Sequence, residues 1–437
     1  MDPTLISVLL LVGLLVMLII GLPIYVCLGL ISVIGILMLQ GPSGLGAIPA
    51  IILDKTAAFV LIAMPLFILM GETIFITGMG GSLYTMFGRW FNRLPGALAM
   101  ASTAASAVFG AMCGVSSAGT ATIGVIAVPE MLERDYDKSL ATGSVAAAGA
   151  LSVLIPPSVP FILYGSITGT SVGRLFIAGI VPGIILSLMM MLYIGILVWL
   201  RPQLAPPMKE VVTWKSRFSA LGHVWPSVLL IVLVLGAIYT GIATPTEAAA
   251  VGAVGALLLA LLVYRALSWR VFVNILRQTV VTNGMIMWIV ACAMLFGYVL
   301  TALQAPQNLA LFVSELQLPL WGIYGSVIFI LLLAGMVVDL ASMVLLTTPI
   351  LLPIVLAVGA DPIWYGVILV LAGEMALITP PVGVNCYIIH GISAPLGVNL
   401  PQILRGAMPF VAVELACIAI FMAFPELALW LPTKMMG

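Results

Sequence analysis

Long apolar stretches divided by short polar ones make up most of the chain. A membrane-spanning helix needs about 20 predominantly apolar residues, with some tolerance for shorter ones. Stretches that meet this requirement lie at 4–20, 22–39, 57–78, 139–165, 173–200, 225–241, 246–264, 281–303, 363–393 and 403–430. The pattern predicts an all-α polytopic membrane protein with about ten spans.

Two further apolar runs, 95–129 and 319–358, have a polar or glycine-rich middle. The first contains "GVSSAGT" (Gly114 to Thr120) and the second contains "VVDLAS" (Val337 to Ser342). Each run is either a pair of spans or a re-entrant hairpin that enters and leaves the membrane on one side.

The positions of the basic residues favour the hairpins. If both runs are hairpins and the N-terminus is outside, three basic residues lie outside, namely Lys55, Arg174 and Lys434, and Arg405 lies near the inner end of the last span. The eleven basic residues then inside are Arg89, Arg93, Arg134, Lys138, Arg201, Lys209, Lys215, Arg217, Arg265, Arg270 and Arg277. Because Lys and Arg accumulate in cytoplasmic loops, we expect this topology, with both termini outside.

The same topology divides the chain into two halves of five spans and one hairpin each. Five is an odd number, so the second half is inserted upside down relative to the first. A repeat at one constant offset along the chain, lengthened slightly near the end, supports a duplication. Its matches are Met112 and Met336, Pro129 and Pro353, Ala148-Gly149 and Ala372-Gly373, Gly179 and Gly406, and Pro182 and Pro409. We predict two inverted repeats, 1–200 and 225–437, joined by a cytoplasmic linker at 201–224.

The segment 265–280 has a pattern of its own. Apolar residues at helical spacing lie beside a polar stripe that contains Arg270, Asn274 and Arg277. This pattern is typical of a helix that lies in the membrane interface, so we expect a helix lying in the inner interface, apart from the span at 281–303. Its counterpart at 41–56 would lie outside.

Each half also carries a proline pair within a predicted span. Pro156-Pro157 fall in 139–165 and Pro380-Pro381 in 363–393, separated by the same offset as Met112 and Met336. An interior proline costs about 3 kcal/mol of helix stability, and interrupted helices persist in membranes only inside protein or beside a watery cavity. A packing kink explains either pair alone. Two pairs at one offset, each preceded by a polar-tipped hairpin, favour the substrate and ion site of a secondary transporter.

Oxygen-bearing side chains and glycines gather at these breaks and hairpin tips. Hydroxyl, carboxamide and carboxylate oxygens suit sodium better than a transition metal, and the glycines permit tight turns. The predicted sodium and substrate site consists of Gly114, Ser116, Ser117, Gly119, Thr120, Pro156, Pro157, Ser158, Asp339, Ser342, Thr379, Pro380, Pro381, Gly383 and Asn385. No basic residue is predicted near the midplane, so helix N-termini, hydroxyls and co-bound sodium would hold an anionic substrate.

Four carboxylates have apolar sequence surroundings: Glu72, Asp339, Glu374 and Glu414. Ionisable residues within membrane segments are functional candidates, and Asp339 is favoured because it lies at a hairpin tip. For Glu374, a functional and a structural role remain equally open. Glu247 is assigned to structure, since Thr244, Pro245 and Glu247 form a capping box with proline at the first helical position.

Composition excludes several classes of protein. The chain is 63% hydrophobic and 7% charged, whereas soluble domains carry about 25% charged residues. Zero net charge gives no reason to expect a nucleic-acid partner. The five cysteines are scattered without a C-x-x-C pair, which predicts packing residues rather than disulfides or a metal site. No basic residue precedes Lys55, so we expect the first apolar run to be a retained span and not a signal peptide.

Several motifs together resemble the large membrane subunit of tripartite ATP-independent periplasmic (TRAP) transporters. They are "MPLFILMGE" (Met64 to Glu72), "LIPPS" (Leu154 to Ser158), "GIATPTEAAA" (Gly241 to Ala250) and "ITPPVGVN" (Ile378 to Asn385). The resemblance extends over nearly the whole chain. It implies a sodium-coupled importer of organic acids in the bacterial inner membrane, working by an elevator motion, with sodium and substrate bound at the hairpin tips and proline breaks.

The resemblance also implies two partners. One is a small membrane subunit of about four spans, expected as a separate chain because this sequence begins almost at once with its first span. The other is a soluble periplasmic binding protein that delivers the substrate. Substrates of the family include sialic acid and four-carbon dicarboxylates, and nothing in the sequence chooses between them.

Three other interpretations remain as alternatives. A stand-alone sodium/dicarboxylate symporter or anion exchanger shares inverted repeats and paired hairpins, although such families often carry Ser-Asn-Thr at the tips. An intramembrane enzyme would need a nucleophile with a base or a metal-ligand cluster, and with two histidines and no such motif we do not expect an enzyme. A passive channel would not need the duplicated breaks, which favour occluding sites.

Overall fold

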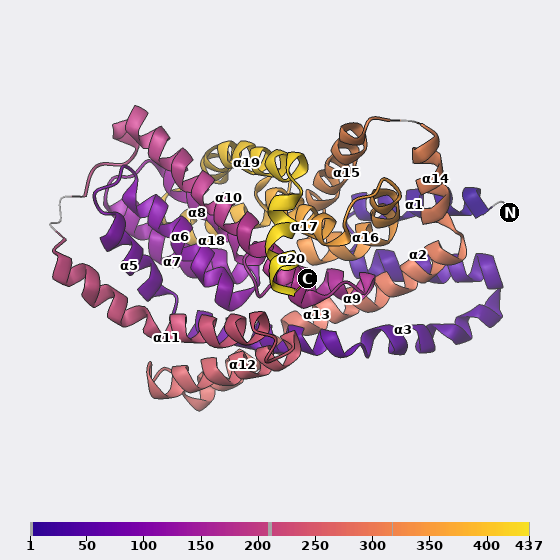
Figure 1. The fold of residues 1–437 in the computed structure, drawn as a ribbon, viewed down its shortest axis with the longest axis horizontal. Helices are drawn as coiled ribbons and strands as arrows, with labels where there is room; N and C mark the ends of the chain where they lie inside the picture. The colour runs from indigo at the N-terminus through magenta and orange to yellow at the C-terminus, as the bar shows by residue number, and fades with distance from the viewer. Residues whose placement is uncertain (1–2, 209–211, 317, 437) are drawn as a thin grey trace.

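The computed structural model describes residues 3–208, 212–316 and 318–436. Within these ranges the regular structure is helical and no strand is present, which confirms the predicted all-α class (Figure 1). The first half contains α1 (Pro3–Ile19), α2 (Ile24–Gln40), η1 (Pro42–Ala47), α3 (Ile48–Thr56), η2 (Phe59–Ile62), α4 (Ala63–Ile76), α5 (Gly81–Phe91), α6 (Ala97–Cys113), α7 (Ser116–Glu133), α8 (Lys138–Leu154), α9 (Val159–Thr168), α10 (Val172–Leu200) and η3 (Pro202–Leu204). The second half contains α11 (Trp214–Tyr239), α12 (Pro245–Leu262), α13 (Trp269–Ala302), α14 (Ala305–Glu315), α15 (Leu320–Gly335), α16 (Leu340–Ala357), α17 (Pro362–Ile378), α18 (Val384–Ser393), η4 (Ala394–Leu396), α19 (Leu400–Ala423) and α20 (Glu426–Met436).

The apolar helices agree with the predicted number of spans. Among the described residues, seven helical segments are long and apolar enough to cross a membrane, and the bent pair α8 and α9 makes an eighth. The shorter apolar helices α1, α2 and α17 have 17 residues each, which still reaches the lower limit for a span. With α16 assigned to the second hairpin, these helices account for about ten spans.

The helix bounds recur at the offset seen in the sequence. α5 and α14 begin and end at positions related by that offset, and so do α7 and α16, and α8 and α17. The two predicted hairpins are the pairs α6–α7 and α15–α16, and the two predicted broken helices are α8–α9 and α17–α18. The division into inverted repeats at 1–200 and 225–437 remains a prediction.

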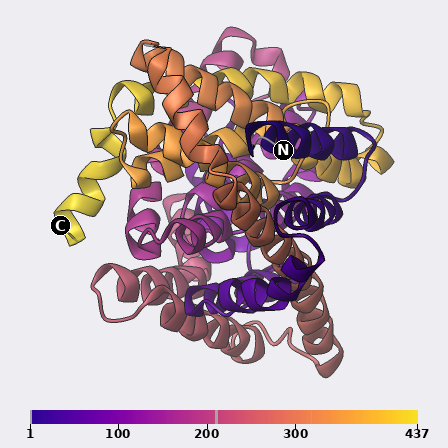
Figure 2. The same cartoon turned by 90° about the vertical axis from the view of Figure 1, so that its right-hand side faces the viewer.

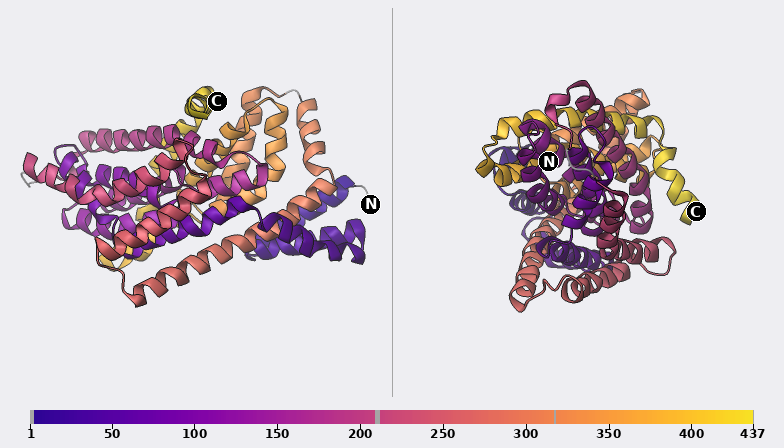
Figure 3. Two further views of the ribbon diagram at one scale, coloured as in Figure 1. Left: turned by 60° about the horizontal axis from the view of Figure 1, so that its bottom comes forward. Right: turned by 90° about the vertical axis from the view of Figure 1, so that its left-hand side faces the viewer.

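The prediction of a separate interfacial helix at 265–280 was wrong. This segment and the following span form one helix of 34 residues, α13, seen as a long uninterrupted helix in the left view of Figure 3. Neither glycine nor proline occurs between Arg265 and Asn283, so nothing ends the helix at the interface. The equivalent segment at 41–56 contains Gly41, Pro42 and Pro49 and is divided into η1 and α3.

The predicted linker is also shorter than expected. α11 begins at Trp214, inside the segment 201–224, and continues without a break into the span predicted at 225–241. Thr213 starts it by accepting a hydrogen bond from the Ser216 amide at 3.3 Å. The predicted inside residue Lys209 lies outside the described residues.

The helices divide into two groups by their packing. We call the first group the frame: α2, α3 and α4 pack with α13, α4 also packs with α12, and α11 packs on α12. We call the second group the bundle: α8 lies at its centre, packed against α6, α7, α10, α17, α18 and α19. The bundle also includes α15 and α16, which pack on α17, and α9, which packs on α10 and α16. In Figure 1 the frame helices α11, α12 and α3 run along the lower edge and the bundle lies above them. Figure 2 shows the described N-terminal and C-terminal helices on different sides of the molecule.

Two short helices connect these groups at equivalent positions of the repeat. α5 packs against α6 of the bundle and α11 of the frame, and α14 packs against α16 of the bundle and α13 of the frame. The bundle itself is tightly packed. A Cβ added to Gly143 of α8 would lie 2.1 Å from the carbonyl carbon of Gly406 in α19. Such close approach of small residues is a common way for membrane helices to associate.

Candidate functional site

The first hairpin tip packs directly onto the first proline break. Gly114 ends α6 with φ of 68°, a left-handed conformation that favours glycine. Its carbonyl accepts a hydrogen bond from the Val159 amide at 3.3 Å. A Cβ at Gly114 would lie 2.4 Å from the Pro157 carbonyl oxygen. The tip and the break therefore form one unit in which only glycine fits at position 114.

The first break itself is buried. α8 ends at Leu154 and α9 begins at Val159, with a bend of 41° between them and a cis bond between Pro156 and Pro157. Pro156, Pro157 and Ser158 are all buried. Ser158 caps α9, since its hydroxyl lies 3.5 Å from the Phe161 amide that donates to it.

The second break is more open. α17 ends at Ile378, the bond between Pro380 and Pro381 is cis, and Gly383 precedes α18 with φ of 52°. Pro381 is exposed, whereas Thr379 and Pro380 are half-buried. The Thr379 hydroxyl donates to the Met375 carbonyl at 2.6 Å, which leaves its oxygen free to accept from or coordinate a ligand.

The second hairpin tip ends in a carboxylate. Asp339 is the N-cap of α16 and accepts a hydrogen bond from the Ser342 amide at 3.2 Å. The Ser342 hydroxyl also donates to the Asp339 carboxylate. Asp339 is half-buried, and a carboxylate is a favoured N-cap because the amides of the first turn lack partners. The tip thus presents a negative charge held in place by its own helix.

Asn385 connects the two halves. It lies in the first turn of α18 and is fully buried. Its Oδ1 accepts from the Ser116 hydroxyl at 3.1 Å, and its Nδ2 donates to the Ala146 carbonyl at 3.2 Å. The Ser116 hydroxyl also lies 3.2 Å from the Gly149 carbonyl. One side chain of the second break is therefore bound to both the tip helix and the broken helix of the first half.

These elements surround one cavity of about 240 Å³, which we call the tip cavity. Five of the predicted site residues line it: Gly114, Ser116, Ser117, Asp339 and Asn385. The other predicted residues lie around it. Gly119 and Thr120 pack onto α8, where a Cβ at Gly119 would meet the Ser152 hydroxyl at 2.1 Å. Among the described residues, the buried Thr120 hydroxyl has no hydrogen-bond partner.

Sequence reasoning missed the frame residues of this cavity. Thr282, Met285 and Ile286 of α13 complete its lining. No signal in the sequence marked them. The sequence pattern predicted an interfacial helix followed by a plain span, whereas the structure has one uninterrupted helix there. Within the described ranges, no lysine or arginine lines the tip cavity, as the predicted topology requires.

The other carboxylates lie elsewhere. Glu374 of α17 and Glu414 of α19 are fully buried. In the part of the chain that the structure describes, neither carboxylate has a hydrogen-bond partner. Glu72 is half-buried. Glu247 forms the predicted capping box with Thr244, which confirms its structural assignment.

Comparison with known proteins identifies the family of the chain. Residues 11–427 match the family described as "Tripartite ATP-independent periplasmic transporter, DctM component". The chain is 37% identical over 396 residues to the C4-dicarboxylate TRAP transporter large permease protein DctM of Pseudomonas aeruginosa, covering 91% of each chain. It is 29% identical over 404 residues to the sialic acid TRAP transporter large permease protein SiaM of Vibrio cholerae, covering 92% of each.

A solved transporter shares the fold. The structure of Neisseria gonorrhoeae MtrF, described as illuminating a class of antimetabolite efflux pumps, superposes with a TM-score of 0.64 over 97% of this chain and 95% of that one. At 14% identity, this likeness concerns the fold alone. The family match and the curated relatives are more specific. Together they show that the chain is a multi-pass membrane transport protein and not an enzyme, and that it belongs to the DctM family of large membrane subunits of TRAP transporters.

Proposed function

We propose that this subunit imports an organic acid together with sodium ions, and that the tip cavity is the site where both bind. The observation that carries the proposal is the composition of that cavity. Two hairpin tips and the residues beside two broken helices meet there, with the Asp339 carboxylate, the Asn385 amide and the hydroxyls of Ser116 and Ser117. Such unwound segments at the midplane supply carbonyl ligands for a cation and helix N-termini for an anion.

Sodium is the coupling ion that this chemistry favours. Among the described residues, the polar side chains lining the tip cavity offer oxygen and amide groups and neither histidine nor thiol, a donor set that suits hard cations. Because the described lining contains no basic side chain, a substrate carboxylate needs positive charge from another source. Bound sodium and the positive helix N-termini at Ser116, Leu340 and Val384 would provide it.

The packing of frame and bundle supports an elevator motion. Both tips and both breaks belong to the bundle, whereas α13 is the one frame helix that lines the tip cavity within the described residues. A shift of the bundle along α13 would carry both tips and both breaks with it. α5 and α14, which contact both groups, would bend or turn during that shift.

The family supports the proposed substrate, partners and location. The relatives named for C4-dicarboxylates and sialic acid support an organic-acid substrate. The tripartite family description supports a small membrane subunit and a periplasmic binding protein as partners, in the bacterial inner membrane. The predicted topology places both termini in the periplasm.

Uptake in proteoliposomes tests the proposal. The chain is reconstituted with its small subunit, and uptake of radiolabelled succinate and sialic acid is measured with and without an inward sodium gradient and the cognate binding protein. We expect uptake that requires both. Uptake that needs sodium alone would make the protein a stand-alone symporter, and uptake that is unchanged without sodium would refute sodium coupling.

A further inference from the structure

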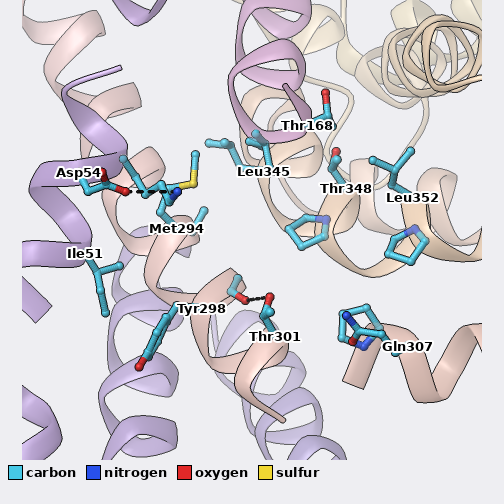
Figure 4. A pocket seen from close by; sticks show the side chains of 17 residues that line it. Ile51, Asp54, Thr168, Met294, Tyr298, Thr301, Gln307, Leu345, Thr348 and Leu352 are labelled. Atoms are coloured by element: carbon cyan, nitrogen blue, oxygen red, sulfur yellow. Dashed lines mark hydrogen bonds and ion pairs between the residues drawn. The ribbon is translucent and has the colours of Figure 1, made fainter. Parts of the chain in front are cut away.

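A second and larger cavity lies between the frame and the bundle, which we call the outer cavity (Figure 4). Its volume is about 540 Å³, within the range of about 300–1,000 Å³ that is typical of small-molecule sites. The frame contributes Asp54 and Lys55 of α3 and the outer half of α13, and the bundle contributes Thr168 of α9 and Thr348 of α16. Gln307 of α14 also lines it.

The two cavities follow one another along three helices. α9 lines the tip cavity at its first residues and the outer cavity at its last, Ile167 and Thr168. α16 contributes Ala341 to the first and Leu345 to the second, about 6 Å further along the helix. α13 contributes Ile286 to the tip cavity and Ala293 to the outer cavity. The three helices thus form a continuous wall from one cavity to the other, and the predicted topology places the outer cavity on the periplasmic side.

Unlike the described lining of the tip cavity, the lining of the outer cavity includes a basic side chain, Lys55. The Lys55 Nζ lies 3.3 Å from the Asp54 Oδ2, and both side chains are more than half exposed. An exposed ion pair between neighbouring residues is weak, so a substrate carboxylate can replace Asp54 as the partner of Lys55. Lys55 therefore attracts an anion into the outer cavity. The described lining of the tip cavity has no positive side chain that could do so.

Thr348 adds a neutral hydroxyl to the lining. The Thr348 side chain is 1% exposed and its hydroxyl has no hydrogen-bond partner among the described residues. A buried hydroxyl without a partner is costly, and beside Lys55 and Gln307 it favours a ligand group that accepts a hydrogen bond from it. Tyr298 also lines the cavity, but its hydroxyl accepts from the Gln40 amide at 2.8 Å and points away from Thr348 in Figure 4. Figure 4 shows Asp54 and Thr348 on opposite sides of the cavity, with Tyr298 and Thr301 on α13 between them.

We propose that the outer cavity is a second binding site for the organic acid, which holds its carboxylate at Lys55 and its remaining polar groups at Thr348 before the substrate reaches the tip cavity. This inference rests on the proposed function. It adds a site on the periplasmic side that is separate from the sodium ligands at the tips.

Occupancy is tested by chemical protection. In Gln307→Cys, a membrane-impermeant thiol reagent added from outside should label the new cysteine, and the transported acid should slow that labelling at least severalfold. Asn308→Cys is the matched control, because Asn308 is the next residue of α14 and does not line the outer cavity. The five native cysteines are buried, so the unmodified protein gives the background. Equal labelling of Gln307→Cys with and without the acid would overturn the proposal.

Transport kinetics test the residues. Removing the charge in Lys55→Gln should raise the KM for the acid roughly three- to fivefold, with the effect shrinking at high salt. Asp54→Asn should lower the KM, because it removes the competing carboxylate. Lys434→Gln, which removes another predicted outer lysine that does not line this cavity, should leave the KM unchanged.

The buried threonine offers an independent comparison. Thr348→Val removes the unpartnered hydroxyl and should raise the KM roughly two- to tenfold. Thr347→Val is its control, since the Thr347 hydroxyl donates to the Met343 carbonyl at 2.7 Å and does not line the cavity. If the unmodified protein takes up no acid, the proposed function fails and the outer site with it. If it takes up acid normally while Lys55→Gln and Thr348→Val match their controls, the outer site alone is refuted.

Discussion

Both proline breaks interrupt a helix at a cis Pro-Pro bond, but their surroundings are different. The first break, from Pro156 to Ser158, is buried and is held against the tip at Gly114. The second break is half-exposed at Thr379 and exposed at Pro381. The comparison indicates that the first break is a rigid half of the site and the second is the half that opens to a ligand.

The side chains at equivalent positions of the two breaks and tips are also different. At the offset that relates the two proline pairs, Ser116 corresponds to Leu340 and Asp339 corresponds to Val115. Asn385 corresponds to Phe161. The repeat therefore preserves the helices and their interruptions, whereas each polar ligand occurs in one half. A single composite site results, because polar groups of both halves line one tip cavity.

The largest expected effect comes from the first tip. Gly114→Ala should abolish transport and lower the free energy of unfolding by more than about 2 kcal/mol, because it adds left-handed strain and a contact of 2.4 Å with the Pro157 carbonyl. Thermal unfolding in detergent and uptake in proteoliposomes measure the two effects.

Gly383→Ala is the matched change at the second break. Its φ is also positive, but the nearest atom to an added Cβ is 3.4 Å away. Gly383→Ala should therefore lower the free energy of unfolding by only about 1–2 kcal/mol. Equal losses at the two glycines would contradict the distinction between a rigid and an open break.

The next largest effect concerns the link between the halves. Asn385→Ala should weaken the apparent sodium affinity roughly tenfold or more, since it leaves the Ser116 hydroxyl and the Ala146 carbonyl without this partner and unsatisfied buried groups cost about 1–3 kcal/mol. The sodium dependence of uptake measures it. Phe161→Leu, at the equivalent position of the first half, should leave the apparent sodium affinity unchanged. If Phe161→Leu weakens that affinity as much as Asn385→Ala does, disturbed packing and not a lost sodium ligand explains the effect.

A smaller effect is expected from the charge at the second tip. Asp339→Asn keeps an efficient N-cap and removes the negative charge, so the fold should be retained while the apparent sodium affinity falls roughly three- to tenfold. Asp361→Asn serves as control, because it makes the same change at another N-cap aspartate, at the start of α17, that does not line the tip cavity. Unchanged sodium dependence in Asp339→Asn would exclude this carboxylate as a sodium ligand.

The smallest effect is expected behind the second break. Glu374 corresponds to Ala150 of the first half, and it is buried without a hydrogen-bond partner among the residues that the structure describes. Because an unpaired buried charge is very costly, Glu374→Gln should change the free energy of unfolding by less than about 1 kcal/mol and preserve uptake. A loss of about 3–5 kcal/mol, the usual cost of breaking a buried ion pair, would instead reveal a bound cation at this carboxylate.

Several features of the fold could be predicted from local sequence. Hydrophobic runs predicted the spans, and the capping box at Thr244 predicted the start of α12. The proline pairs predicted both broken helices to within a few residues. The errors occurred at 201–224 and 265–280, where polar residues interrupt the apolar pattern while the backbone remains helical, so that polarity was mistaken for a helix end.

By itself, the sequence determined the class of the protein, its helices, the offset at which their bounds recur and the places where helices break, because hydrophobicity, proline and glycine act locally on the backbone. Only the tertiary structure decided which oxygen donors share a cavity. The meeting of Ser116 with Asn385 joins residues 269 positions apart, and Thr282 enters the lining from a helix with no mark in its sequence. Packing within the bundle brings Ser116 to Asn385, packing of the bundle against the frame brings Thr282 to the cavity, and no spacing along one helix encodes either.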